Sequence, residues 1–513
     1  MRTRAFLDGA AFGYFNQGIV MLAGLWLTPF LLRHLGQSDY GRWLVCMQVL
    51  GYAMLADFGT VAILPREIAY ATGGSDPKEQ AEALAGLIGR TARVVLWQAL
   101  LVLLITGGLL LFSSKIPNDF RLPSYIVAAG FVLAFPFRIF SATLEGFQQL
   151  RLLGKMRSLI WAASTLTTVI SILLGFRVYS LALGWLVSQI GFSLASYLQV
   201  RRLFPWLVST ETLLHYSNIV WHDLFRGGWI SVGQVAQILI SGTDLLVVGH
   251  ILGPAAVVVY SSTGKLLSAL ANQPMILINA AMPGLSQMKV AESREKLLSV
   301  STAMGQGMLL IGGAVAVCVL CVNKAFIGLW IGSQFFGGTL LTLLFILNMV
   351  FRQLDICFAV ALFAFGHEKQ MAIKGVADGL FGVGLALLLG PLFGLAGVNG
   401  ATLLAALLIS VPTNMYLLAR QCHVSMRQIL RPYLPWLWRF TLLAIVAWKA
   451  SSTTWMASYS HAAVACAATL LLYVAIMATY VPNSQLQPYL RTLTLRISAM
   501  MYPWFARPSH TSA

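Results

Sequence analysis

Polar and charged side chains recur at helical spacing inside stretches that are otherwise apolar. One run steps by three, three, four and three residues, and a second by four, three and four. Such steps place side chains on one face of an α-helix. A polar face of this kind lines a wet cavity or bonds to neighbouring helices. The runs are Ser231, Gln234, Gln237, Ser241 and Asp244; Ser261, Lys265, Ser268 and Asn272; Asn348, Arg352 and Asp355; and Arg138, Ser141 and Glu145.

Three cations among these residues point to the binding of an anion. A charge at the centre of a bilayer costs on the order of 3 kcal/mol, so Arg138, Lys265 and Arg352 each need a partner or a wet cavity. Desolvated Lys and Arg bind phosphate strongly, and Arg can do so through two nitrogens. The predicted substrate-binding residues are these three cations, with polar support from Gln234, Gln237, Asn272 and Asn348.

Four acids in apolar segments are candidates for coupling to a proton or a sodium ion. They are Asp57, Asp244, Asp355 and Asp378. The alternative is an ion pair with one of the cations, and both interpretations stay open. Arg352 and Asp355, at i and i+3, can pair within one helix. Under this alternative, Lys265 would pair with Asp244.

The sequence contains no motif of covalent chemistry. It has no Walker A, GxSxG or HExxH pattern. The six cysteines lie mostly in apolar segments and imply no disulfide framework. We therefore predict no catalytic residue, no metal site and no cofactor, and the chain is not expected to be an enzyme.

The elements that must position these residues are membrane helices. Hydrophobic residues make up 58% of the 513 residues and charged residues only 10%, against about 25% charged in an ordinary soluble domain. A span needs roughly 20 apolar residues, and lipid forces each span to be helical. The N-terminal apolar segment has no cleavage site and is predicted to be retained as the first span. The fourteen expected helices are 10–32, 40–63, 85–112, 123–146, 157–176, 179–200, 226–251, 254–282, 301–323, 340–365, 371–391, 394–419, 437–457 and 461–481.

The distribution of Lys and Arg predicts the orientation. With the N-terminal side taken as inside, inside segments hold 24 of the 34 basic residues, with Lys369 and Lys374 counted there, and outside segments hold 7. Basic loops face the cytoplasm, so both termini are predicted to be cytoplasmic in a multi-pass protein of the bacterial inner membrane. The net charge of +17 is then topological, and nucleic acid is not an expected partner.

The domain organisation follows from a weak internal repeat. The segments LRHLG at 32–36 and GHILG at 249–253 each separate an outgoing from an incoming helix. We expect an all-α protein of two pseudo-repeated six-helix lobes plus two C-terminal helices. The expected parts are an N-lobe at 1–203, an interfacial linker helix at 204–225, a C-lobe at 226–420, two further helices at 421–482, and a basic cytoplasmic tail at 483–513.

Several segments carry a family resemblance. They are LTPFLLRHLGQSDYGRW at 27–43, LADFG at 55–59, PREIA at 65–69, DLLVVGHILGPAAVVVYSSTGKLLSALANQP at 244–274 and MPGLSQM at 282–288. The chain resembles the polysaccharide-transport branch of the multidrug/oligosaccharidyl-lipid/polysaccharide exporter superfamily. The resemblance implies flippases of O-antigen or exopolysaccharide units, with Asp57, Arg66, Asp244 and Lys265 at matching positions and Arg66 in a gating role. The lipid II flippase has basic residues early in its first helix, whereas this chain has Asn16 and Gln17 in that region. The resemblance therefore disfavours lipid II as the substrate.

The expected function is therefore the translocation, by alternating access, of an oligosaccharide linked to undecaprenyl diphosphate. The implied partners are this lipid-linked oligosaccharide, membrane lipids, and polysaccharide polymerase and chain-length proteins. A drug/cation antiporter of the same fold is the alternative, but its cavity should be acidic or aromatic. A membrane glycosyltransferase or polymerase is a third reading, which the short outer loops disfavour.

Overall fold

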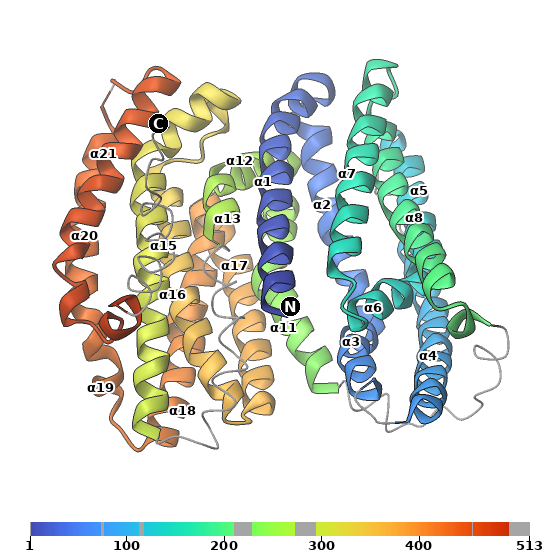
Figure 1. The fold of residues 1–513 in the computed structure, drawn as a ribbon. Coiled ribbons are helices and arrows are strands. Elements are labelled where there is room, and N and C mark those ends of the chain that lie inside the picture. Colours follow the sequence, from blue (N-terminus) through green and yellow to red (C-terminus); the bar gives the residue numbers. More distant parts are fainter. Residues whose placement is uncertain are drawn as a thin grey trace, which may run out of the picture. The chain divides into compact units, whose positions relative to one another are not determined.

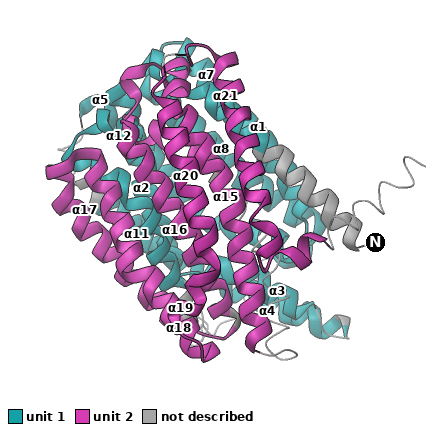
Figure 2. Cartoon of the chain, turned by 90° about the vertical axis from the view of Figure 1, so that its left-hand side faces the viewer, with its two compact units in different colours: residues 1–258 teal, residues 259–513 magenta. Residues whose placement is uncertain are grey.

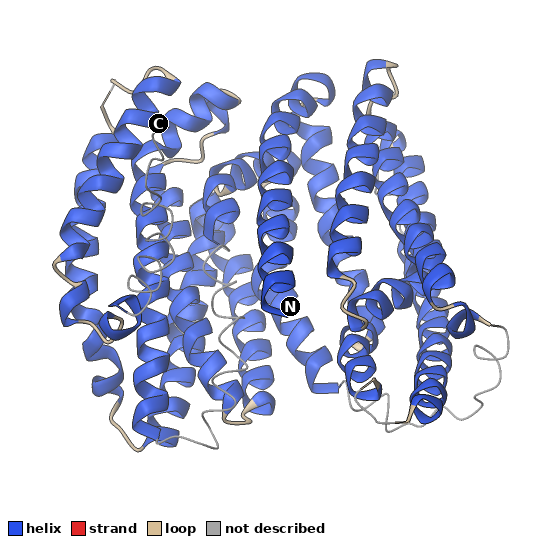
Figure 3. Cartoon of the chain, viewed as in Figure 1, coloured by secondary structure: helices blue, strands red, loops and turns tan. Residues whose placement is uncertain are grey.

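The structure is a computed structural model, and it describes residues 2–72, 76–111, 117–209, 228–271, 294–453 and 455–491. Within these ranges the chain is helical and contains no strand (Figure 3). The predicted site residue Asn272, most of the predicted linker helix and most of the C-terminal tail lie outside them.

The helices fall into two compact units, residues 1–258 and 259–513 (Figure 2). The first contains α1 (Arg2–Leu35), α2 (Gln37–Ala53), α3 (Thr60–Ala71), α4 (Pro77–Leu111), α5 (Asn118–Ala134), α6 (Arg138–Gly146), α7 (Leu150–Leu173), α8 (Val178–Leu203) and α11 (Gly228–Ile251). Helix α12 (Pro254–Thr263) crosses the division. The second contains α13 (Lys265–Ala271), α15 (Arg294–Trp330), α16 (Thr339–Ala364), α17 (Glu368–Ala405), α18 (Val411–Cys422), α19 (Met426–Leu430), α20 (Leu434–Ser451) and α21 (Tyr459–Ala478).

Each of the fourteen predicted ranges is mostly helical where the structure describes it, apart from turns at Phe58–Gly59 and Gly264 and at the ends of several ranges. By length and composition, nine helices in the described ranges can cross a membrane, or ten if the bent pair α2 and α3 counts as one. The stretch Lys369–Cys422 has 54 residues, which as one helix would measure about 80 Å, far more than the roughly 30 Å of a bilayer core. Gly394, at φ 60° and ψ −140°, breaks it. This break lies at the junction of the predicted ranges 371–391 and 394–419, and the number of spans stays a prediction.

The weak sequence repeat has a structural counterpart in the first unit. Gly36 ends α1 at φ 83°, and Gly253 follows α11 at φ 87°. A residue at positive φ terminates a helix at little cost only when it is glycine. In both places a new helix begins at the next residue. The shared glycine of the two segments therefore makes the same turn twice.

In the first unit, α7 packs along α8, α5 packs on α8, and α2 packs on α11 (Figure 1). Tyr52 of α2 hydrogen-bonds to Thr243 of α11. This contact explains why α11 belongs to the first compact unit. The domain limits expected from the sequence stay predictions.

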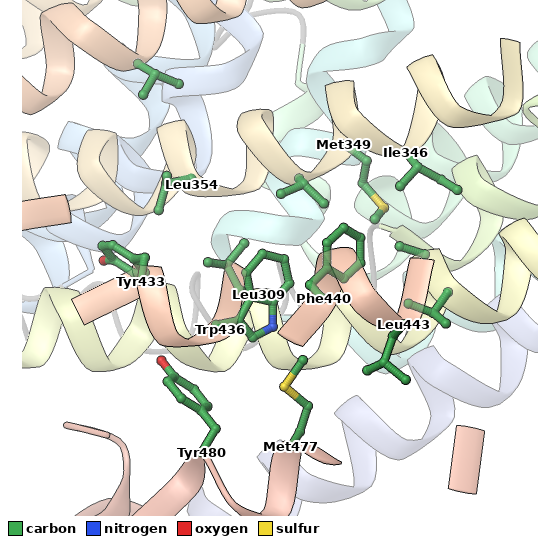
Figure 4. Close-up of a cluster of buried hydrophobic side chains, with 14 of the residues drawn as sticks. Leu309, Ile346, Met349, Leu354, Tyr433, Trp436, Phe440, Leu443, Met477 and Tyr480 are labelled. Carbon is green, nitrogen blue, oxygen red and sulfur yellow. The ribbon is translucent and has the colours of Figure 1, made fainter. Parts of the chain in front are cut away.

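The second unit is built around the long helix α15, which packs against α16, α20 and α21 (Figure 1). Its buried core includes Leu309, Trp436, Phe440 and Met477, whose side chains lie together in Figure 4. Trp436 is only 1% exposed, and its indole N–H donates to Tyr473 Oη over 3.3 Å. The predicted helices 13 and 14 are therefore an integral part of this unit.

Candidate functional site

Two interrupted helices meet in the first unit. The chain breaks between α2 and α3 at Phe58 and Gly59, both with positive φ, and the two helices are bent by 48°. It also breaks between α5 and α6 at the 3₁₀ turn Phe135–Phe137, which contains Pro136. The half-helices α3 and α6 then pack on each other. A Cβ on Gly146 would lie 2.7 Å from Ile68 Cβ, so this close approach requires glycine.

An ion pair joins the two breaks. Asp57 ends the 3₁₀ turn after α2, and Arg138 is the first residue of α6. Arg138 Nη2 lies 2.9 Å from Asp57 Oδ2. The predicted coupling residue Asp57 and the predicted substrate-binding residue Arg138 are thus partners, as the ion-pair alternative allows.

The surroundings of Asp57 hold it in place independently of Arg138. The Gly59 backbone N–H donates to Asp57 Oδ1 over 2.9 Å. Gln98 of α4 donates through Nε2 to the Asp57 carbonyl oxygen at 2.8 Å and to Thr60 Oγ1 at 2.9 Å. Asp57 is 3% exposed. These bonds fix both the broken backbone and the carboxylate.

Arg138 is only partly satisfied by this pair. Its Nη1 atom is buried and has no hydrogen-bond partner within the described ranges. The guanidinium lies 5.4 Å from the centre of the Phe135 ring, and the side chain is 28% exposed. A buried donor without an acceptor costs about 1–3 kcal/mol, so this nitrogen favours any anion that can reach it.

Arg352 in the second unit is more completely paired. Its Nη1 contacts Asp378 Oδ2, and its Nη2 lies 3.1 Å from Asp378 Oδ1. Nη2 also donates to the Thr402 carbonyl at 3.2 Å, and Ser410 Oγ donates to Asp378. Asp378 is fully buried. The bidentate pair neutralises both groups without a ligand.

A second ion pair lies beside the first. Lys374 Nζ is 3.0 Å from Asp355 Oδ2, and Asn414 Nδ2 donates to Asp355 Oδ1 at 2.8 Å. The pair of Arg352 with Asp355 that the i, i+3 spacing suggested is therefore wrong. Helices α16 and α17 pack together, and their register gives each of these residues a partner on the other helix.

In each ion pair the carboxylate also accepts a hydrogen bond from a neutral side chain, and both of these side chains come from one irregular helix. The π-helical turn Ala406–Ser410 leads into α18. Ser410 and Asn414 follow at i and i+4, so one face of this segment serves both ion pairs. A π-turn rotates the helix face, which is why such turns are common at functional sites.

Sequence reasoning missed Lys374, Ser410 and Asn414. It counted Lys374 among cytoplasmic loop cations, but the structure places it inside α17 with a side chain only 8% exposed. Its i, i+4 spacing to Asp378 was the available signal. Nothing in the local sequence marks Ser410 or Asn414 as partners.

Lys265 follows a third helix break. Helix α12 ends at Thr263 and α13 starts at Lys265. Asn323 of α15 holds the break by donating from Nδ2 to the Thr263 carbonyl at 3.0 Å. The Lys265 side chain is half-buried, and within the described ranges no hydrogen bond or ion pair of its ammonium group is found. Its charge is therefore uncompensated there.

The remaining predicted residues lie in varied surroundings. Gln234 and Asp244 are half-buried and Gln237 is exposed, all on α11. Asn348 Nδ2 donates to Thr402 Oγ1 at 3.1 Å, beside the Arg352 pair. Arg66 is 56% exposed and lies 3.8 Å from its neighbour Glu67.

The first unit also contains a mostly apolar pocket of about 390 Å³. Its lining includes Arg42, Val49, Phe120, Val127 and Pro254. None of the predicted site residues lines it, so this pocket is separate from the charged sites described above.

The fold is that of a known class of membrane transporter. The lipid II flippase MurJ, in an inward closed conformation, matches with a TM-score of 0.65 at 13% identity, over 93% of this chain and 99% of that chain. An inward-facing multidrug resistance MATE family transporter of the MOP superfamily matches with a TM-score of 0.60 at 15% identity, over 76% and 93%. The chain is a multi-pass membrane protein of this all-helical fold.

The sequence narrows this class to a family. The family profile described as polysaccharide biosynthesis protein matches residues 6–289, more than half of the chain, and the chain belongs to that family. The uncharacterized membrane protein EpsK of Bacillus subtilis (strain 168) is 25% identical over 84% of this chain and 87% of its own length. A Shigella flexneri protein whose name assigns it provisionally as an O-antigen transporter is 22% identical over 64% and 77%. The resemblance inferred from the sequence is confirmed.

Proposed function

We propose that this protein is a flippase that moves an oligosaccharide linked to undecaprenyl diphosphate across the bacterial cytoplasmic membrane. Family membership and a fold shared with flippases and exporters support translocation without covalent chemistry. The names of the relatives support a glycan-linked cargo. Alternating access of the two units would expose the head group first inside and then outside.

The observation that carries this proposal is the unequal pairing of the three predicted cations. Arg352 is fully compensated by Asp378. Arg138 keeps a buried nitrogen without an acceptor in the described part of the chain, and Lys265 has no described partner. We assign diphosphate recognition to Arg138 and Lys265, and a structural role to Arg352. Cations at these positions disfavour a cationic drug as cargo.

For ion coupling, we propose Asp57, with Asp244 as a second candidate, ahead of Asp355 and Asp378, because Arg138 binds the Asp57 carboxylate through one nitrogen only. Each of the latter two is buried in an ion pair within the second unit. Binding a proton or a sodium ion there would first have to break that pair, at a cost of several kcal/mol.

A flipping assay tests the proposal directly. The purified protein is reconstituted into vesicles that carry a fluorescent undecaprenyl-diphosphate oligosaccharide, and membrane-impermeant dithionite quenches the outer leaflet. We expect wild-type protein to make both leaflets accessible over time. The matched control is a vesicle without protein, in which only the outer leaflet is quenched. Equal quenching in both preparations would contradict a flippase function.

The proposed orientation is tested by single cysteines in a cysteine-free variant. The exposed residues Gln334 and Lys369 flank the two ends of α16. With both termini in the cytoplasm, a cysteine at Gln334 should react with an impermeant maleimide in intact cells, and one at Lys369 should react only after lysis. The opposite pattern would reverse the topology.

A further inference from the structure

We propose that the Asp57 carboxylate is an internal competitor for the substrate: it occupies the Arg138 anion site at rest, and an isoprenyl diphosphate displaces it. The inference rests on the proposed function and adds a residue that sets anion specificity. It follows from the geometry of the Asp57–Arg138 pair and from a comparison with the Arg352–Asp378 pair.

The first step is the incomplete contact between Asp57 and Arg138. Only Nη2 reaches the carboxylate, at 2.9 Å, and Nη1 stays buried with no acceptor within the described ranges. Arg352, by contrast, uses both terminal nitrogens on Asp378. Because bidentate pairs are stronger and more specific, the Asp57 pair is the weaker and the more easily exchanged of the two.

The second step is that Asp57 keeps a partner after Arg138 leaves. Its Oδ1 accepts the Gly59 N–H at 2.9 Å, and this bond does not involve Arg138. Asp378 has no such backbone donor in the described part of the chain; its other partner, Ser410, also lies 3.5 Å from Arg352. When Arg138 leaves, Asp57 therefore keeps a hydrogen bond from the rigid backbone of the helix break, which lowers the cost of releasing the arginine.

The third step is the chemistry of the displacing ligand. A diphosphate carries more charge than a carboxylate and has several oxygens, so it can engage both Nη1 and Nη2 of one guanidinium. Attraction at a given distance grows with the charge of the anion. A lone carboxylate or a weak anion would gain little over Asp57. The resident carboxylate thus restricts binding to strongly charged anions such as a diphosphate.

The experiment measures the affinity of the full-length protein in lipid nanodiscs for farnesyl diphosphate, used as the probe. Asp57→Asn removes the competing charge but keeps the shape of the side chain. It should tighten binding by about 5- to 50-fold, a usual range for coupling between two sites. Arg138→Gln should weaken binding by roughly tenfold or more, since it removes charge-assisted hydrogen bonds.

A matched control and a second variant complete the design. Asp39→Asn removes a carboxylate of the same unit that pairs with Arg42 at 3.0 Å, and it should leave the affinity unchanged. Asp57→Ser removes the charge but keeps an oxygen for the Gly59 N–H. It replaces Asp57→Asn if that variant does not fold, and it should tighten binding as well.

The outcomes separate this inference from the proposed function. If Arg138→Gln weakens binding but neither Asp57 variant tightens it, Asp57 only positions Arg138 and the inference is overturned, while diphosphate recognition stands. If Arg138→Gln binds the probe as wild type does, recognition at Arg138 fails and the inference fails with it. Binding by neither wild type nor the Asp57 variants would overturn both.

Discussion

Export of polysaccharide should fall to less than about a tenth of the wild-type level when Lys265 is replaced by alanine. A charge-assisted hydrogen bond to an anion contributes about 1.5–3 kcal/mol, which corresponds to roughly 10- to 150-fold in binding. Lys265 is half-buried and has no described partner inside the protein, so its substitution leaves no unpaired internal carboxylate in the described ranges. Expression and folding should therefore be preserved, and the loss should lie in transport.

The measurement is surface polysaccharide in a strain whose own flippase gene is deleted and replaced by each variant. Lys324→Ala is the matched control, since Lys324 is an exposed lysine of the same unit, and it should export normally. Lys265→Arg should retain part of the activity because it keeps the charge. Normal export by Lys265→Ala would remove Lys265 from the binding site.

The second large effect concerns stability. Arg352→Met should destabilise the protein by about 3–5 kcal/mol, because it leaves the Asp378 carboxylate uncompensated in the interior. Asp378 is fully buried and Arg352 is only 17% exposed, so water cannot replace the lost partner. Thermal unfolding of the purified protein in detergent should show a clearly lower midpoint.

The double variant Arg352→Met with Asp378→Asn should recover most of the lost stability, since both buried charges vanish together. Arg42→Met is the control, because it breaks the partly exposed pair of Arg42 and Asp39, whose side chains are 35% and 20% exposed. This substitution should lower the free energy of unfolding by at most about 1 kcal/mol. If Arg352→Met instead abolished export with an unchanged unfolding midpoint, Arg352 would belong to the substrate site.

The two predictions differ because Arg352 has an ion-pair partner and Lys265 has none in the described ranges. Sequence spacing can suggest ion pairs only within one helix. Residues 352 and 355 share a face of α16, and residues 374 and 378 share a face of α17. Spacing alone favours the pair of Arg352 with Asp355. The packing of α16 against α17 instead brings Arg352 to Asp378 and Lys374 to Asp355.

The broken helices were only partly visible in the sequence. Pro136 and Gly59 mark places where a helix is interrupted, and Gly264 marks another between α12 and α13. The sequence did not show that two of these breaks are followed directly by a charged residue, which is what makes them candidates for a binding site. Arg138 follows one break and Lys265 follows another, whereas Arg352 lies in the middle of a continuous helix.

The sequence by itself determined the class of the protein, the positions of its helices and the family. Hydropathy, helical periodicity and glycine at helix ends are local properties of the chain, and lipid leaves an apolar segment no alternative to a helix. Only the tertiary structure decided which charged residues form ion pairs with each other. A buried charge is compensated by whichever opposite charge comes within about 4 Å, and that distance depends on how separate helices pack. Arg138, with one nitrogen bound to Asp57 and the other unsatisfied in the described chain, and Arg352, with both nitrogens bound to Asp378, are the same residue type in similar apolar sequences, and packing alone separates them.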